Sequence, residues 1–183
     1  MLLYLIRHSA VAPDPNVPGP RWRLSPEGRE AADALGSEPF WKELRGIHTS
    51  VELKAVATAQ RIAAPNELPI RIERDLREVE GRMWVEEGYA DLVRDYLAGE
   101  PPDGWEPLDA ARSRVRACID GIVDRHTGLS VGIVSHGIVL TIYLADVLSL
   151  DANAAIDLWK SIRFPDVAVL NPEQKRLERT FGS

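Results

Sequence analysis

Cysteine, long apolar runs and excess positive charge are all scarce in this sequence. A single cysteine, Cys118, among 183 residues excludes an internal disulfide bond and favours a cytoplasmic protein. The apolar stretches are short and broken by glycine, serine or charged residues, so none approaches the ~20 residues that cross a membrane. The net charge of −6 argues against a general nucleic-acid-binding protein. We therefore expect no membrane and no nucleic-acid partner, although a local cluster of cations can still bind a small anion.

What the chain does contain is an ordinary globular composition in an alternating pattern of strands and helices. Hydrophobic residues make up 45% and charged residues 27% of the chain, and its length predicts one domain over residues 1–183. We expect strands over residues 2–7, 46–50, 70–72, 131–134, 164–170 and 176–181. We expect helices over 26–36, 40–44, 53–64, 90–97, 108–125 and 138–148. Irregular chain is expected over 10–20, 75–87 and 99–107. The alternation predicts an α/β fold of three layers, α/β/α, in which helices flank a mostly parallel central sheet.

Two of the predicted strands end close to a histidine. His8 follows Arg7 at the end of the first strand, and His136 lies two residues beyond the apolar run 131–134. Functional groups collect at the carboxyl ends of strands in an open parallel sheet. If these two strands are neighbours, both imidazoles and the Arg7 guanidinium meet at one place, which suits an anionic substrate and a histidine nucleophile. Either histidine alone fits a hydrogen-bonded structural role equally well, whereas the two together favour function.

Two further segments carry polar residues whose role the pattern alone leaves open. Residues 50–59 have the pattern of a helix start with a capping serine, and Lys54 falls in the first turn. Residues 76–81 place Glu78 and Glu80 in a predicted loop. Taken alone, the lysine and the two acids are typical of solvated surface residues.

Four blocks of sequence follow one another in a defined order. They are Leu5-Ile6-Arg7-His8-Ser9, then Leu24-Ser25-Pro26-Glu27-Gly28, then Ser50 to Ala59, and finally Leu76-Arg77-Glu78 followed by Val134-Ser135-His136-Gly137. They resemble, in the same order, four motifs of the histidine phosphatase superfamily. The first block resembles its Arg-His-Gly signature and the second its Leu-Thr-x-x-Gly helix start. The third resembles its Ser-x-x-x-Arg-Ala-x-x-Thr-Ala segment, and the last resembles its acid loop and second histidine. This superfamily is also called phosphoglycerate-mutase-like. The resemblance covers roughly residues 3–148, and the order of the blocks is more specific than any single motif.

The resemblance implies a role for each matching residue. His8 would be the catalytic nucleophile that forms a phosphohistidine, and Glu78 would protonate the leaving oxygen and then activate water. The residues implied for phosphoryl binding are Arg7, Lys54, His136 and Gly137, of which His136 also belongs to the catalytic set. The implied activity is metal-independent hydrolysis of a small phosphomonoester without a cofactor. This chemistry is sound, because a neutral imidazole attacks phosphorus and fixed cations stabilise the charge of the transition state.

Two departures from the family pattern bear on activity. Ser9 stands where the family has a glycine, which would permit close backbone approach, and Lys54 replaces an arginine and so lacks its bidentate fork. Two alternatives therefore stay open: phosphoglycerate-mutase-type phosphoryl transfer, and a phosphate-binding regulatory domain with weak or no turnover. The divergent loop after His8 favours hydrolysis over transfer. The physiological substrate and the oligomeric state are not defined by the sequence.

Several other polar residues are weaker candidates. Glu80 is a second candidate acid, less favoured because it lies outside the Leu-x-Glu pattern. Arg21 and Arg23 either reach a charged substrate or are solvated. His48 and His126 fall outside the matching blocks and are expected at the surface or in loops.

Overall fold

A sheet of six strands organises the computed structural model, which describes residues 1–81 and 87–183. The strands of this sheet are β1 (Leu3–Arg7), β4 (Leu44–Ser50), β5 (Ile70–Glu73), β6 (Ser130–Ser135), β7 (Asp166–Asn171) and β8 (Arg176–Arg179), and β2 (Val11–Ala12) pairs separately with β3 (Arg23–Leu24). The α-helices are α1 (Pro26–Gly36), α2 (Leu53–Ala63), α3 (Tyr89–Leu97), α4 (Leu108–Arg125), α5 (Gly137–Leu148) and α6 (Ala152–Ser161). Short 3-10 turns cover η1 (Gly19–Arg21), η2 (Pro39–Glu43), η3 (Ala64–Asn66) and η4 (Arg74–Leu76).

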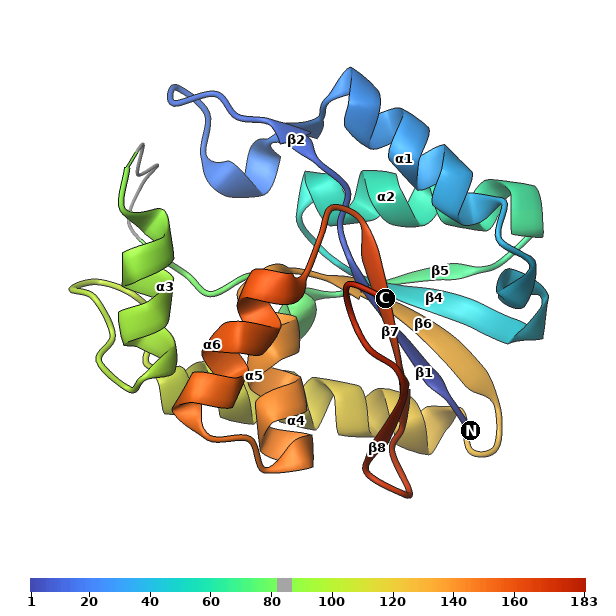
Figure 1. The fold of residues 1–183 in the computed structure, drawn as a ribbon. Helices are drawn as coiled ribbons and strands as arrows, with labels where there is room; N and C mark the ends of the chain where they lie inside the picture. Colours follow the sequence, from blue (N-terminus) through green and yellow to red (C-terminus); the bar gives the residue numbers. More distant parts are fainter. Residues whose placement is uncertain (82–86) are drawn as a thin grey trace.

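The sheet places β1 and β6 side by side near its centre. The strand order is β5-β4-β6-β1-β7-β8, in which β5, β4, β6 and β1 run parallel and the last two strands are antiparallel to their neighbours. In the β1–β6 pair, Leu3 lies opposite Val131 and Arg7 lies opposite Ser135. The carboxyl ends of these two strands therefore meet at one edge of the sheet (Figure 1).

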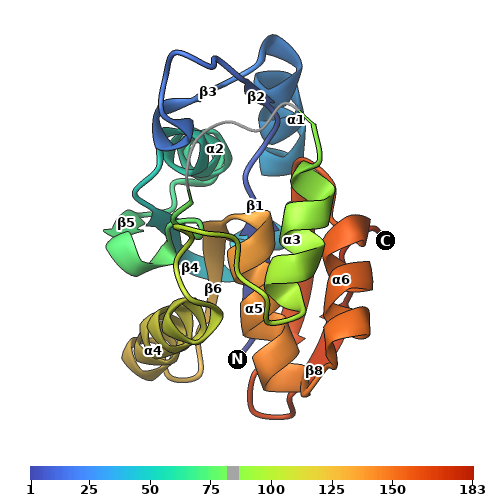
Figure 2. The ribbon, with the colours of Figure 1, turned by 90° about the vertical axis from the view of Figure 1, so that its left-hand side faces the viewer.

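Successive side chains of β1 point to opposite faces of the sheet and pack into two hydrophobic cores. Leu3 and Leu5 pack with residues of α3, α4, α5 and α6, whereas Tyr4 and Ile6 pack with residues of α2 and η2 and with Leu35 of α1. Figure 2 shows α1 and α2 on one side of the sheet and α3 to α6 on the other. The expected three-layer α/β/α fold with a mostly parallel sheet is thereby confirmed. Among the residues described, none of the helices is long and apolar enough to cross a membrane.

Most predicted elements agree with the structure to within a few residues. Helix α6 was not expected; Asp151 caps it by accepting a hydrogen bond from the Ala154 N–H at 2.8 Å. The helix predicted over 40–44 is the 3-10 turn η2, and strand β7 begins at Asp166, because Pro165 has no N–H to donate to a sheet. The prediction of irregular chain over 75–87 partly concerns residues 82–86, which lie outside the described residues.

Candidate active site

The two histidines at the strand ends lie against each other. The backbone N–H of His8 donates to the backbone carbonyl oxygen of Ser135 at 3.0 Å. Ser135 is the last residue of β6, and His136 comes directly after it. The two imidazole rings meet edge to face with their centroids 5.1 Å apart, and both side chains are buried. The two strands that lead to these histidines are therefore neighbours, which is the condition under which the sequence pattern brings both imidazoles to one place.

Hydrogen bonding determines which nitrogen of His8 is free. Its Nδ1 lies 2.8 Å from the carbonyl oxygen of Ser9. A carbonyl can only accept, so Nδ1 carries the proton of the neutral ring and Nε2 keeps its lone pair. Burial, followed by the nearby His136 ring, lowers the pKa of His8 well below its usual range, and the charges of Lys54 and Arg7 act in the same direction. His8 is therefore neutral at pH 7 and presents Nε2 as a nucleophile.

Ser9 supports the loop that follows His8. Its hydroxyl donates to the Gly28 carbonyl at 2.6 Å, and its N–H donates to the Thr58 hydroxyl at 2.9 Å. Its backbone is outside the left-handed region, so a serine is accommodated here without strain. The close backbone approach occurs instead at Gly28, where a Cβ would overlap the carbonyl oxygen of Ala10. Ser9 is thus a buried structural residue of this loop.

The Arg7 guanidinium lies across the start of α5. Its Nη1 donates to the carbonyl oxygen of Ile162 at 2.7 Å. A Cβ on Gly137 would lie 3.1 Å from Cζ and 3.2 Å from Nε of Arg7, so the glycine leaves room for the guanidinium. The Phe164 ring covers the group, with its centroid 3.4 Å from Cζ. Burial lowers the pKa of Arg7 to about 10, so the side chain is still a cation at pH 7.

Two buried nitrogens of this cluster have no hydrogen-bond partner within the described residues: Nε of Arg7 and Nδ1 of His136. The other ring nitrogen of His136, Nε2, lies 2.8 Å from the Ser50 hydroxyl. That hydroxyl accepts the Glu52 N–H at 3.2 Å and can donate its own proton to Nε2; in the tautomer that accepts this proton, neutral His136 carries its ring proton on Nδ1. An unpaired buried donor costs about 1–3 kcal/mol. The two nitrogens are therefore suited to an anionic acceptor such as a phosphoryl group.

Lys54 enters the site as one half of a buried ion pair. Its Nζ lies 2.8 Å from Glu52 Oε2 and donates to the Gly19 carbonyl at 3.2 Å. The other carboxylate oxygen of Glu52 accepts the Glu78 N–H at 2.7 Å and lies 3.6 Å from Nε2 of His136. Sequence analysis did not identify Glu52, because an acid just before a helix is typical of a solvated N-terminal residue. Only the position of β4 beside β6 reveals that this acid is buried in the site.

Glu78 is fixed at the start of α5. Its carboxylate lies within hydrogen-bond distance of the N–H groups of Val79 at 3.0 Å, Val139 at 3.1 Å and Ile138 at 3.3 Å. Burial raises the pKa of Glu78, the nearby charge of Glu52 raises it further, and the backbone N–H groups oppose the shift. Glu78 therefore holds a proton to higher pH than an exposed glutamate, as a general acid requires.

The remaining candidates lie outside this cluster. The Glu80 side chain is 65% exposed and pairs with Arg77 at 2.7 Å. The prediction that His48 is a surface or loop residue is wrong: it is buried in strand β4. Its Nδ1 bonds Glu73 at 2.8 Å, and its Nε2 lies 3.0 Å from Nε2 of His126, which is half-buried at the end of α4.

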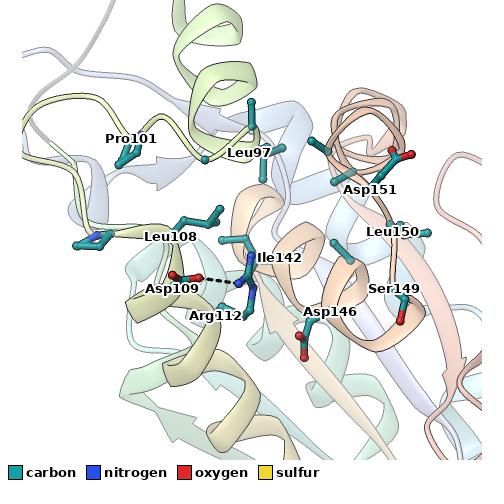
Figure 3. Close-up of a pocket in the computed structure, with 16 residues that line it drawn as sticks. Leu97, Pro101, Leu108, Asp109, Arg112, Ile142, Asp146, Ser149, Leu150 and Asp151 are labelled. Atoms are coloured by element: carbon teal, nitrogen blue, oxygen red, sulfur yellow. Dashed lines mark hydrogen bonds and ion pairs between the residues drawn. The ribbon is translucent and has the colours of Figure 1, made fainter.

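A pocket of about 750 Å³ lies apart from the histidine pair, among α3, α4, α5 and α6 (Figure 3). Its sixteen lining residues include Leu97, Leu108 and Ile142, together with an ion pair between Arg112 and Asp109 at 2.6 Å, but no histidine, lysine or cysteine. In the described part of the chain, no group of three or more His, Cys, Asp or Glu residues is arranged to hold a metal ion. The side chains suited to phosphoryl chemistry are therefore those around His8 and His136.

The fold and the buried cluster define an α/β protein with a candidate anion site at the adjoining ends of β1 and β6. The family model described as the histidine phosphatase superfamily (branch 1) matches residues 3–169. The chain therefore belongs to the histidine phosphatase superfamily. A comparison with curated proteins finds no match.

Several solved structures, two of them named as phosphatases, share this fold. Bacillus stearothermophilus YhfR is 24% identical with a TM-score of 0.78, and the alignment covers 100% of this chain and 96% of that one. A mycobacterial glucosyl-3-phosphoglycerate phosphatase, Rv2419c, is 22% identical with a TM-score of 0.80 and coverage of 100% and 99%. The phosphoserine phosphatase of Entamoeba histolytica is 15% identical with a TM-score of 0.78 and coverage of 100% and 96%. At these identities the similarity concerns the fold.

Proposed function

We propose that this protein hydrolyses phosphomonoesters through a phosphohistidine formed on Nε2 of His8. The observation that carries the proposal is the free lone pair of Nε2 beside two buried unpaired donors, Nε of Arg7 and Nδ1 of His136. A phosphoryl group has three oxygens that can accept from these donors while its phosphorus faces Nε2. Membership of the superfamily and the phosphatases among its structural neighbours support hydrolysis.

In the first step, Nε2 of His8 attacks phosphorus, and the N–P bond forms as the bond from phosphorus to the leaving oxygen breaks. Glu78, whose pKa is raised, gives its proton to that oxygen, so the leaving group departs as an alcohol. Arg7 and Lys54 offset the charge on the phosphoryl oxygens. The Ser9 carbonyl keeps the Nδ1 proton in place and stabilises the positive charge that the phosphorylated ring acquires.

In the second step, the Glu78 carboxylate accepts a proton from a water molecule. The water oxygen forms a bond to phosphorus as the N–P bond breaks, which releases inorganic phosphate and returns His8 to its neutral state. Glu78 is then protonated again and ready for the next cycle. Because the cations and donors all belong to the chain, we expect turnover without a metal ion or a cofactor.

The test is hydrolysis of p-nitrophenyl phosphate between pH 5 and 7 in the presence of a chelator, with phosphate release and ester loss both measured. The His8→Ala variant should lose activity, while His126→Ala, which changes a histidine outside the site, should retain it. Rapid quenching should trap an acid-labile phosphoryl group on the wild-type protein but not on His8→Ala. Equal rates in wild type and His8→Ala would contradict the proposal, as would ester loss without phosphate release, which indicates transfer to another acceptor.

A further inference from the structure

The buried charges of the site are nearly balanced before a substrate binds. Lys54 is paired with Glu52 at 2.8 Å, and the buried carboxylate of Asp166 acts on the charge of Arg7. When Glu78 is protonated, the two cations, Arg7 and Lys54, are balanced by the carboxylates of Glu52 and Asp166. A phosphomonoester brings up to two negative charges by itself. These buried groups therefore supply no further positive charge for a second anionic group on the substrate.

Phe164 brings an apolar surface directly to the phosphoryl site. Its ring centroid lies 3.4 Å from Cζ of Arg7 and 5.4 Å from the ring of His8. The side chain is still 43% exposed, although it contacts two buried polar groups. Figure 1 shows the connection between α6 and β7, which carries Phe164, reaching the same edge of the sheet as the end of β1. An exposed phenyl face here is available to a group bound beside the phosphate.

Two further rings lie beside the other charged groups. Tyr89, the first residue of α3, is 43% exposed, and its hydroxyl lies close enough to Glu78 and Arg7 for both charges to act on its pKa. The Trp22 ring centroid lies 5.7 Å from Nζ of Lys54. Aromatic faces from three separate segments thus border the cations and the acid.

From this charge balance and these rings we infer that the site selects phosphomonoesters whose leaving group is an uncharged aromatic or apolar alcohol. The inference rests on the proposed function. An apolar leaving group would cover the Phe164 and Tyr89 faces and remove them from water. A carboxylated leaving group would lose hydration near Glu52 and Asp166 without gaining a buried cation. The preference would differ from that expected of neighbours named for phosphoserine or glucosyl-3-phosphoglycerate, whose substrates carry a carboxylate.

The experiment compares three primary alkyl phosphates, which keep the reactivity of the leaving oxygen similar: benzyl phosphate, ethyl phosphate and 3-phosphoglycerate. We expect kcat/KM to be at least about 10-fold higher for benzyl than for ethyl phosphate, because one apolar group in a pocket gives roughly 10- to 200-fold discrimination. The value for 3-phosphoglycerate should be the lowest of the three. A wild-type preference for 3-phosphoglycerate over benzyl phosphate would overturn the inference.

Variants locate the origin of the preference. Phe164→Ala should reduce the benzyl-to-ethyl ratio by about 10-fold, whereas Phe164→Leu, which keeps an apolar side chain, should retain most of it. Arg21 at the end of η1 and Arg23 at the start of β3 are exposed cations and provide the opposing test. If Arg21→Ala or Arg23→Ala selectively lowers activity on 3-phosphoglycerate from a high wild-type value, the substrate is carboxylated and the inference fails.

The outcomes separate the inference from the proposed function. Hydrolysis that depends on His8 but shows no benzyl preference leaves the function standing and overturns the inference. If no ester is hydrolysed, the proposed function fails, and the selectivity is then decided by calorimetric binding of benzylphosphonate and 3-phosphonopropionate. Equal or tighter binding of the carboxylated phosphonate would overturn the inference in that case as well.

Discussion

Replacing Glu52 by glutamine removes one charge from the centre of the site while preserving the shape of the side chain. In the wild-type protein, Glu52 holds Nζ of Lys54 at 2.8 Å and the Glu78 N–H at 2.7 Å. A glutamine oxygen can still accept the Glu78 N–H, but the amide NH2 group would then face Lys54. The variant should therefore keep the fold and leave the lysine charge buried without its carboxylate.

The expected loss of stability follows from the burial of the pair. The side chains of Lys54 and Glu52 are only 10% and 5% exposed. At 2.8 Å their attraction is about 6 kcal/mol for an effective dielectric constant of ~20, most of which is offset by desolvation. Removing one partner of a buried pair costs ~3–5 kcal/mol, and the remaining bond from Lys54 to the Gly19 carbonyl favours the lower end. For a chain of this size, about 3 kcal/mol corresponds to a fall in Tm of about 6–12 °C.

Phosphate should reverse much of this effect. In the Glu52→Gln variant, the bound anion becomes the partner of Lys54 and is no longer repelled by the buried carboxylate of Glu52. We expect the Kd for inorganic phosphate to fall about 10-fold, or ~1.4 kcal/mol. Saturating phosphate should accordingly raise the Tm of Glu52→Gln by more than it raises that of the wild type. The pKa of Glu78 should also fall, because the like charge of Glu52 helps to raise it.

The assay is calorimetric unfolding at pH 7.5 with and without phosphate, together with titration of phosphate by isothermal calorimetry. Glu30→Gln, a change of the same chemistry at an exposed position on α1, is the matched control and should leave both Tm and Kd unchanged. A Glu52→Gln variant as stable as wild type in phosphate-free buffer would refute the ion-pair argument. A weaker phosphate affinity in that variant would refute the proposed charge balance.

Three further predictions concern the glycine, the histidines and the lysine of the site. Gly137→Ala places a Cβ 3.1 Å from Cζ of Arg7 and should therefore displace the guanidinium. We expect kcat/KM to fall about 10- to 100-fold with little change in Tm. A lower Tm with unchanged kcat/KM would contradict the argument that Gly137 leaves room for Arg7. The pKa values of buried His8 and His136 lie well below the ~6.5 of an unfolded histidine, so below pH ~6.5 only the unfolded chain binds these protons. The free energy of unfolding in urea should therefore fall by up to ~1.4 kcal/mol per pH unit for each histidine, and His8→Asn should weaken this dependence; equal stability at pH 7.5 and 5.5 would refute it. Lys54→Arg should raise kcat/KM on p-nitrophenyl phosphate a few-fold, because a guanidinium can hold both a carboxylate and a phosphoryl oxygen, and an unchanged or lower value would count against the argument.

The strands that position the site were predictable because their signals are local. Residues 2–6 and 131–134 are continuous apolar runs, which is typical of strands buried on both faces, and a histidine lies two residues beyond each of them. Helix α6 has a weaker signal, since its described buried residues are only Ala155 and Ile156. Two adjacent buried side chains, one small and one branched, do not produce the spacing of apolar residues by which a helix is recognised in a sequence.

Glu52 and His48 show where local sequence fails. Both are polar residues near the carboxyl end of β4, and polarity alone predicts exposure for each. Their burial depends on tertiary contacts rather than on the strand itself, since Arg45 of the same strand β4 is exposed. Glu73 and His126 then satisfy His48, as Lys54 satisfies Glu52. Such partners come from distant parts of the chain and are set by topology rather than by spacing.

The pairing of β1 with β6 also joins parts of the site that are made at different times during synthesis of the chain. His8 is made before the strand whose Ser135 carbonyl fixes its backbone and before Phe164, whose ring covers Arg7. Until then β1 has neither of its two neighbours, β6 and β7, and its apolar side chains need other cover. Ile6 can already pack against residues of η2 and α2, which precede β6 in the chain, but the backbone of β1 then has no strand beside it. The two histidines can therefore meet only after β6 has been made and has paired with β1, so one pairing completes both the centre of the sheet and the histidine pair.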